Sequence, residues 1–542
     1  MNKFAILSFM ICLVVLMGCI DSGPDSTANG SLVEGERYSQ GHHPDIIKQI
    51  NSLISEQTST APRENYNMGG YPVSDGGMYP SDLNWPNDEP YDLVFFENYG
   101  VNPFISTEDE TFSTFGMDVD TASYTIVKYW IENGNWPDKD SVRTEEFINY
   151  FDQDYANPED TFGIYLEGAK SEFGQPNYHL IKVGIKAKEV SLAERKAANM
   201  IFVVDVSGSM NRENRLELVK YSLRQLASNL KEGDKIGLVI YGSNGQKVSD
   251  LTSNKNEIMN AIEELVPGGS TNAEEGLAIA YQMAREGYEE GKINRIILCS
   301  DGVANVGHTG ADSILKQIKN DADKGITLTA LGFGMGNYND VLMEQLANHG
   351  DGNYYYIDDQ EEADRLFEDG AVDMLQVIGS DAKIQVEFNE NAVDRFRLIG
   401  YENKRLETED FRNDSVDAGE VGAGQTVTAL YEIRIKDNAN PDDLAAIVRI
   451  RYNDIDTKEV VEKQQKIYVN NIDKPFNESS PRFRFTAAVA EYSEILKESY
   501  WAKDGDLNDV LNVAQNAVNS MDTCEKDTEF LELVEKTKNI KK

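Results

Sequence analysis

The chain has 542 residues, room for about three domains, and 40% of them are hydrophobic, which is enough to build apolar cores. It carries 93 acidic residues against 51 lysines and arginines, for a formal net charge of −42. Phosphate binding needs a basic surface, so this charge excludes nucleic acid as an expected partner. We interpret the acidity as a solvating surface, with attraction of a basic or cationic partner as the alternative.

Residues 1–18 have the pattern of a signal peptide. Lys3 supplies positive charge, an apolar run follows, and Gly18 stands directly before Cys19. This ending resembles the lipobox of prokaryotic lipoproteins. The resemblance implies cleavage before Cys19, lipidation of its sulfur and an extracytoplasmic, lipid-anchored protein; an uncleaved N-terminal anchor is the alternative. Ile20 occupies the position of the usual inner-membrane retention Asp, so the anchor is expected in an outer membrane where two membranes exist. Otherwise it is expected on the outer face of the cell membrane.

Cysteine use does not suggest a disulfide framework. After cleavage the chain keeps Cys19, Cys299 and Cys524, of which the first would carry lipid and the second lies inside an apolar strand. The exported domains must therefore be stable through their cores.

The next two segments differ sharply in composition. Residues 19–90 are rich in Gly, Ser, Asn, Pro and Asp and are predicted to form a flexible tether. Residues 91–197 form an N-terminal flanking region with helices followed by alternating strands. The elements expected there are helices Tyr124–Glu132 and Arg143–Phe151 and strands Phe162–Leu166 and His179–Ala187.

The first of these helices begins after a short acidic segment. Asp120 or Thr121 is expected as its N-cap. A second metal-binding loop at Asp118 and Asp120 is the weaker alternative.

Residues 198–378 alternate strand and helix throughout, which predicts a doubly wound parallel sheet of the α/β class. A helix is expected to begin at Thr271, and another to run from Glu361 to Val377. The expected strands are Ile201–Asp205, Ile236–Tyr241, Ile296–Cys299, Ile326–Phe333 and Tyr354–Ile357, with Val248–Leu251 as a short edge strand.

From residue 379 to 475 the pattern changes to strands with polar turns, which predicts an antiparallel sandwich-like domain. The expected strands are Ile384–Phe388, Val427–Ile435, Ala446–Tyr452 and Lys466–Val469. The strands at 162–187 have the same character, so we expect them to join that sheet, with the α/β domain inserted between its two parts. Residues 476–542 are expected to be helical, with helices Phe485–Glu498 and Leu507–Val518.

Oxygen-bearing side chains follow several elements of the α/β domain. Asp205, Ser207 and Ser209 end its first strand, Thr271 starts a helix, and Asp301 ends the fourth strand. In a doubly wound sheet these loops converge on one crevice. Two carboxylates and three hydroxyls suit Mg²⁺, Ca²⁺ or Mn²⁺ rather than zinc. An ion held by so few anions keeps positive charge and an open position, so it should attract a partner's carboxylate.

These five residues resemble the metal-ion-dependent adhesion site of von Willebrand factor type A (VWA) domains. In that family the Asp and two Ser lie on the first loop, the Thr on the second and the last Asp on the third. The resemblance implies a divalent cation, with Mg²⁺ favoured, and a protein ligand that offers an Asp or Glu carboxylate.

The flanking regions resemble those of a prokaryotic VWA lipoprotein family. The N-terminal part of this resemblance includes Asp118–Tyr124 and Ile148–Phe151, and the C-terminal part includes Arg397–Asn403 and Ala429–Glu432. The resemblance covers about residues 100 to 520. It implies the domain architecture of the chain more than its biological role.

Other chemistries find no support in the sequence. It has no P-loop motif for a nucleotide, no His-Glu-x-x-His and no Gly-x-Ser-x-Gly elbow, and His308 reads as a loop residue. We therefore expect a non-enzymatic, lipid-anchored binding protein. The alternative is an envelope assembly or scaffold protein whose VWA metal is structural.

Overall fold

The computed structural model describes residues 96, 98–117, 119–302, 311–334, 340–369, 371–416 and 418–540. The predicted signal peptide, Cys19, the tether, Asp118 and His308 lie outside these residues.

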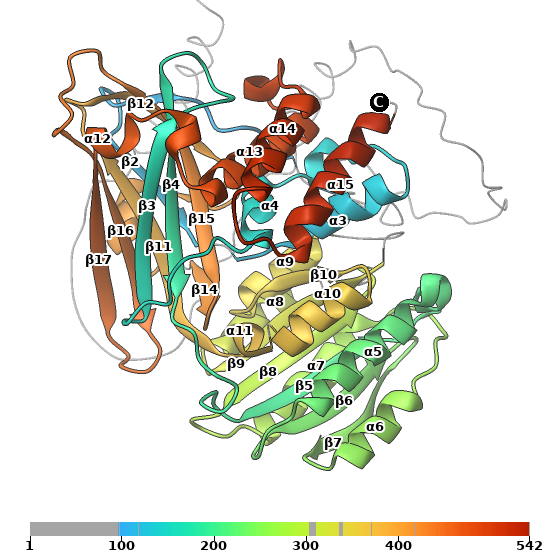
Figure 1. Cartoon of the computed structure of the whole chain (residues 1–542). Helices are drawn as coiled ribbons and strands as arrows, with labels where there is room; N and C mark the ends of the chain where they lie inside the picture. The colour runs from blue at the N-terminus through green and yellow to red at the C-terminus, as the bar shows by residue number, and fades with distance from the viewer. Residues whose placement is uncertain are drawn as a thin grey trace, which may run out of the picture. The chain divides into compact units, whose positions relative to one another are not determined.

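The α/β domain is built on a six-stranded sheet in the order β10-β9-β8-β5-β6-β7 (Figure 1). Neighbouring strands are parallel except for the edge strand β7, which runs antiparallel to β6. All eight residues of the central strand β5 are buried, as its run of apolar residues predicts. The strands are β5 Ala198–Asp205, β6 Lys235–Tyr241, β7 Gly245–Thr252, β8 Ile293–Ser300, β9 Ile326–Phe333 and β10 Tyr354–Ile357.

Helices cover both faces of this sheet, so it has two apolar cores. Phe202 and Leu223 belong to one core, whereas Val203 and Leu277 belong to the other. This alternation along β5 confirms the predicted doubly wound α/β class. The covering helices are α5 Arg215–Ser228, α6 Lys255–Glu263, α7 Ala273–Glu286, α8 Ala311–Ala322 and α9 Asp340–His349.

The single helix predicted from Glu361 to Val377 is wrong. The segment consists of α10 Gln360–Asp364, a π-helical turn η4 Arg365–Asp369 and α11 Ala371–Leu375. Tertiary contacts explain the break: Asp364 Oδ1 accepts hydrogen bonds from the Tyr221 hydroxyl at 2.7 Å and from Gln225 Nε2 at 2.7 Å, both on α5. These bonds fix the end of α10 against α5, and the π-helical turn begins at the next residue in place of a continued straight helix.

The rest of the chain forms a sandwich of two antiparallel sheets. Strand β4 from before the α/β domain pairs with β15 from after it, with Ile181 opposite Tyr431. This pairing confirms that the α/β domain is inserted between two parts of one β domain. One sheet contains β1 Ile105–Ser106, β12 Val393–Ile399, β15 Thr426–Ile435, β4 Tyr178–Ala187 and β3 Phe162–Lys170. The other contains β13 Arg405–Leu406, β2 Phe112–Gly116, β11 Val377–Phe388, β16 Leu444–Asp454 and β17 Val460–Tyr468, with β14 Gly419–Gly422 beside β11.

A helical layer packs on the outer face of the sandwich. Its core joins aromatic residues such as Phe147, Phe485 and Phe530 to Leu180 and Leu430 of the sheet. The short helix α12 Val469–Ile472 packs into the core of the sandwich instead. The helices of the layer are α3 Ala122–Glu132, α4 Thr144–Tyr150, α13 Pro481–Leu496, α14 Leu507–Val518 and α15 Glu525–Asn539. The last of these was not predicted individually.

The first helix of this layer also covers the edge of the α/β sheet. Thr121 is the N-cap residue of α3, as one of the two predicted candidates, but its side chain makes no cap hydrogen bond. Asp120 Oδ1 instead accepts from the backbone N–H of Tyr354 at 2.9 Å, and the Thr125 hydroxyl donates to the carbonyl of Tyr356 at 3.3 Å. Asp120 before α3 and Thr125 within it thus bond backbone groups of the edge strand β10.

Cys299 is buried and Cys524 is exposed, and both are free thiols. Within the residues that the structure covers, every helix is too short or too polar to cross a membrane.

We expect Asp373 on α11 to make stability depend on pH. Burial raises the pKa of its carboxyl to about 7. The protonated form is therefore favoured in the folded state, and the contribution of this group to stability is present at pH 4 and lost as the pH rises through 7. Asp373→Asn should increase the free energy of unfolding at pH 8 by about 1–2 kcal/mol relative to wild type and change it little at pH 4. Urea unfolding at both pH values measures this, and an equal effect at both would contradict it.

Candidate metal site

The first loop of the site follows directly from the central strand. Asp205 ends β5 and is fully buried, and Ser207 is 2% exposed. The backbone N–H of Ser207 donates to Asp205 Oδ1 at 2.7 Å, and the hydroxyls of Ser207 and Ser209 are 2.9 Å apart. A short 3₁₀ segment, η3 Gly208–Asn214, then leads into α5. The sharp turn after β5 therefore brings these three predicted ligands into one loop.

The second loop is bonded to the first through backbone groups. The N–H of Gly208 donates to the carbonyl of Gly269 at 3.0 Å, and the N–H of Gly268 donates to the carbonyl of Val206 at 2.6 Å. Thr271 follows two residues after Gly269 and is half-buried. These bonds hold the segment that contains Thr271 beside the Asp205 loop.

The prediction that Thr271 begins a helix is wrong by two residues. Helix α7 begins at Ala273, and Asn272 is its N-cap, whose side chain accepts from the N–H of Glu275 at 3.3 Å. Asn272 therefore caps the helix, and the Thr271 hydroxyl is not needed for that purpose.

The third loop begins where β8 ends. Asp301 follows Ser300 directly, and both side chains are fully buried. The Ser300 hydroxyl donates to Asp205 Oδ2 at 3.4 Å, which links the ends of the two neighbouring strands. Within the described part of the chain, Asp301 Oδ1 has no hydrogen-bond partner although it is buried.

The two carboxylates are close enough to influence each other electrostatically. Burial, and then the neighbouring charge of Asp301, raise the pKa of Asp205 to about 7. A divalent cation would stabilise both carboxylates in their charged form. Together with three hydroxyls they form an all-oxygen donor set, so these residues fit a hard cation such as Mg²⁺.

An arginine that the sequence reasoning missed belongs to the same site. Arg215, the first residue of α5, is 3% exposed, and its Nη1 donates to Asp301 Oδ2 at 3.0 Å. Gly334 accommodates it, because a Cβ there would overlap with the arginine side chain. A cation at a helix N-terminus is unfavourable in the field of the helix dipole. An arginine at the predicted start of a helix therefore indicated that a nearby anion pairs with it.

Comparison with known families matches three stretches of the chain. The model "von Willebrand factor type A domain" matches residues 199–369, and "von Willebrand factor" matches residues 92–182. The model "Uncharacterized protein YfbK, C-terminal" matches residues 373–540. The three matches together span the N-terminal flank, the α/β domain and the C-terminal part.

Two relatives illustrate how far the similarity extends. "Uncharacterized protein YfbK" of Escherichia coli is 35% identical over 450 residues, covering 78% of this chain and 77% of that protein. Inter-alpha-trypsin inhibitor heavy chain H3 of Pongo abelii is 26% identical over 268 residues, which is 44% of this chain and 29% of that protein.

Two solved structures resemble parts of the chain. They are a von Willebrand factor type A protein from Catenulispora acidiphila and the ArnB paralog VWA2 from Sulfolobus acidocaldarius. The first has a TM-score of 0.42 and 14% identity and covers 68% of this chain and 89% of its own. The second has a TM-score of 0.37 and 16% identity and covers 70% and 98%.

The similarity to the Escherichia coli protein extends over most of both chains and includes the flanking regions as well as the VWA domain. The chain belongs to the YfbK family of VWA-domain proteins.

Proposed function

We propose that this protein captures a protein ligand through a divalent cation held by Asp205, Ser207, Ser209, Thr271 and Asp301. The observation that carries the proposal is Asp301 Oδ1, a buried carboxylate oxygen that lacks a partner in the described residues, at the edge where Asp205 also lies. A buried acceptor without a donor costs about 1–3 kcal/mol, which a bound cation would offset. Mg²⁺ is the favoured ion, and Ca²⁺ and Mn²⁺ are compatible with the same oxygens.

The charges of the site favour an acidic ligand. Two carboxylates would balance a divalent ion, so the positive charge that the sequence analysis expects on the ion would come instead from the guanidinium of Arg215 beside Asp301. The loaded site would therefore carry about one net positive charge in a largely buried setting. An Asp or Glu carboxylate from a partner completes both the coordination and the charge balance.

We further propose that the protein is extracytoplasmic and lipid-anchored. The support is the sequence around Cys19, where an apolar run ends in Gly-Cys. An anchor at Cys19 followed by the Gly- and Ser-rich residues 19–90 would hold the binding domain away from the membrane surface. A scaffold role, with a structural metal, is the competing function.

Metal binding is the first test. Wild type, stripped with EDTA and dialysed, is expected to bind Mg²⁺ in isothermal titration calorimetry, and Asp301→Asn or Asp205→Ala should weaken binding at least tenfold through loss of an anionic ligand. Asp321→Asn is the matched control: Asp321 is 2% exposed and accepts from Arg285 at 2.6 Å, but it lies on α8 away from the site. Equal Mg²⁺ affinity in Asp301→Asn and Asp321→Asn would mean that the metal lies elsewhere.

Removing the charge of Arg215 is expected to strengthen Mg²⁺ binding, whereas removing a carboxylate weakens it. Arg215→Met removes a positive charge next to Asp301, so we expect Mg²⁺ to bind about tenfold more tightly by Coulomb's law at an effective dielectric near 20. The same change should lower the melting temperature of the metal-free protein, because Asp301 loses its buried partner. Calorimetry and thermal unfolding measure the two effects. An unchanged Mg²⁺ affinity would show that Arg215 does not act on the metal.

Capture through the metal predicts partners that EDTA releases. Immobilised wild type should retain specific proteins from an envelope extract in Mg²⁺, and EDTA or Asp301→Asn should remove them, whereas Asp321→Asn should keep them. Partners that persist in EDTA and on Asp301→Asn would favour the scaffold function.

A further inference from the structure

A large open cavity lies where the chain passes between the β domain and the α/β domain. Its volume is about 830 Å³, within the range of roughly 300–1,000 Å³ that ligand sites occupy. Residues 189–192 and 194, on the segment that leads from β4 into the α/β domain, line it together with residues 371–373 of α11. The other lining residues are Asn157, Lys186, Asn229 and Gly424. The cavity is therefore shared by the two domains.

Asp373 of α11 is the acidic residue of this cavity that lacks a partner. Among the described residues its carboxyl has neither a hydrogen-bond donor nor an ion-pair partner. The side chain is partly exposed and lines the cavity, so a ligand can reach it. Gly424 leaves room for this carboxyl, because a Cβ at that position would lie only 2.8 Å from Asp373 Oδ1.

The other charged side chains of the lining already have partners. Lys186 Nζ lies 3.1 Å from Glu189 Oε1, and Glu194 Oε2 accepts from the Ser191 hydroxyl at 2.6 Å. Asp373 is therefore the lining carboxylate without any donor, and a cationic ligand would supply one.

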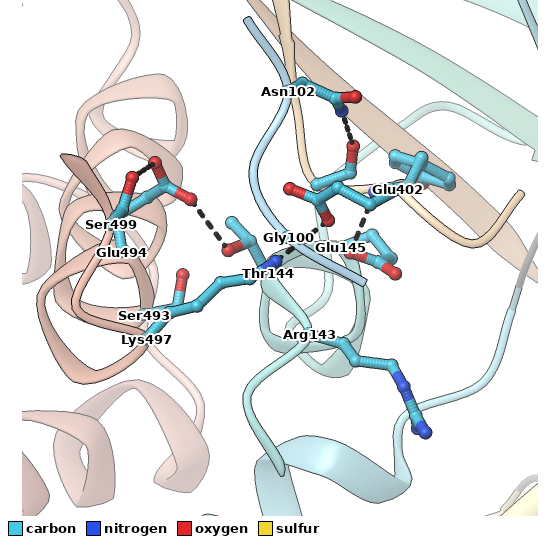
Figure 2. Close-up of polar contacts among 12 residues, drawn as sticks. Gly100, Asn102, Arg143, Thr144, Glu145, Glu402, Ser493, Glu494, Lys497 and Ser499 are labelled. Atoms are coloured by element: carbon cyan, nitrogen blue, oxygen red, sulfur yellow. Dashed lines mark hydrogen bonds and ion pairs between the residues drawn. The ribbon is translucent and has the colours of Figure 1, made fainter. Parts of the chain in front are cut away.

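Elsewhere in the protein a buried carboxylate is surrounded by donors. Glu494, which is 2% exposed, accepts from the hydroxyls of Thr144 at 3.3 Å and Ser499 at 2.8 Å (Figure 2). Without such donors, burial raises the pKa of Asp373 to about 7, so its charged form weakens the folded state at neutral pH. A carboxyl that costs stability and faces a cavity is the kind of group that binds ligands.

Apolar side chains line the same cavity and restrict the kind of cation. They are Val190, Leu192, Ala371 and Val372, and Leu192 is 45% exposed. Contact with an apolar group of a ligand would remove this leucine from water. A divalent metal prefers oxygens from several carboxylates and carbonyls, whereas only one lining carboxylate lacks a partner. The cavity therefore suits a cation on an apolar carrier.

A basic side chain of another protein has this chemistry. Lysine and arginine carry their charge at the end of an apolar stem, and the neighbouring residues of a peptide can occupy the rest of the volume. The net charge of −42 also attracts a basic segment over long range.

We infer that this cavity docks a basic peptide segment of a partner protein, with a lysine or arginine side chain paired to Asp373 and an apolar neighbour against Leu192. The cavity shares no residue with the proposed metal site. A partner can therefore bind here whether or not a metal binds there.

Calorimetry with the full chain tests this docking site. The probes are the peptide Ac-Leu-Lys-Leu-NH₂ and its arginine counterpart, at constant ionic strength set with NaCl, and at least one of them is expected to bind saturably. The same peptide with norleucine in place of lysine keeps the apolar stem but has no charge, so it should bind at least tenfold more weakly. Methylammonium is the small-amine probe and should bind more weakly than the basic peptide.

Four variants assign the binding to the cavity. Asp373→Asn should weaken binding of the basic peptide at least tenfold, and Leu192→Ser about fivefold through loss of apolar contact. Lys186→Met removes a cation whose charge acts on Asp373 and should tighten binding several-fold. Asp358→Asn is the matched control: burial also raises the pKa of Asp358 to about 7, but this residue does not line the cavity.

Binding of the basic peptide should also depend on pH. With a pKa of about 7, the Asp373 carboxyl is mostly protonated at pH 6 and mostly charged at pH 8. Only the charged form pairs with the peptide, so wild type should bind about tenfold more tightly at pH 8 than at pH 6. Asp373→Asn should lose this dependence. The other charged groups that act on Asp373 are Lys186, Glu189 and Arg365.

Any of four outcomes would overturn this docking site. The first is that neither basic peptide binds saturably. The second is that the norleucine peptide binds as tightly as the basic ones, and the third is that methylammonium does. The fourth is that Asp373→Asn and Asp358→Asn bind alike. If Asp373→Asn does not fold, equal binding by Leu192→Ser and wild type excludes the site instead.

Discussion

Two buried carboxylates at the ends of adjacent parallel strands set the chemistry of the α/β domain. Strands β5 and β8 are direct neighbours in register, so Asp205 and Asp301 emerge side by side from the same edge of the sheet. Neither can move away without dismantling the centre of the sheet, because both strands are buried on both faces. Burial, and then the charge of Asp301, raise the pKa of Asp205, and Arg215 pairs with only one oxygen of Asp301. The fold thus holds two buried carboxylates close together at this edge, an arrangement that a bound cation would stabilise.

Buried polar groups join the α/β domain to the rest of the chain, beside the apolar contact that Ala122 and Ile126 of α3 make with the core of the α/β sheet. Glu344 of α9 is 6% exposed and contacts Arg143 of the N-terminal flank at 3.2 Å and Lys404 of the β domain at 3.2 Å. Burial alone would raise its pKa, but Arg143 and Lys404 bring it down to about 2. Asp120 makes a comparable link from the flank to β10. Because such bonds are directional, they fix how the inserted domain sits on its base.

Local sequence pattern accounts for the centre of the fold and fails at its margins. The apolar strands β5 and β8 and the alternating β15 were predicted because burial on one or two faces dictates their residues. The edge strand β17 was predicted only at its end, since Glu462 to Lys466 are all polar and carry no apolar alternation. Strand β12 was missed for a different reason: it is mostly buried, but its charged Arg397 is buried through ion pairs with Glu432 and Glu494, which local sequence does not reveal.

The same distinction applies to the site. The Asp-x-Ser-x-Ser loop is a local signal, and its position after a buried strand could be inferred. The contact of Arg215 with Asp301 and the bond of Asp120 to β10 join residues 86 and 234 positions apart. No local pattern reports such pairs. They follow only from the register of the sheet and the packing of helices on it.

The overall acidity restricts which ligands could use the proposed metal site. A chain with a net charge of −42 repels an acidic partner at long range, yet the proposed loaded site needs a carboxylate. At physiological ionic strength salt screens this repulsion beyond about 8 Å. The charges of Arg215 and the proposed cation would therefore determine whether a carboxylate binds at the site. A partner that presents one acidic side chain within an otherwise basic surface satisfies both conditions. Its basic surroundings favour approach to the acidic protein, and its carboxylate completes the site.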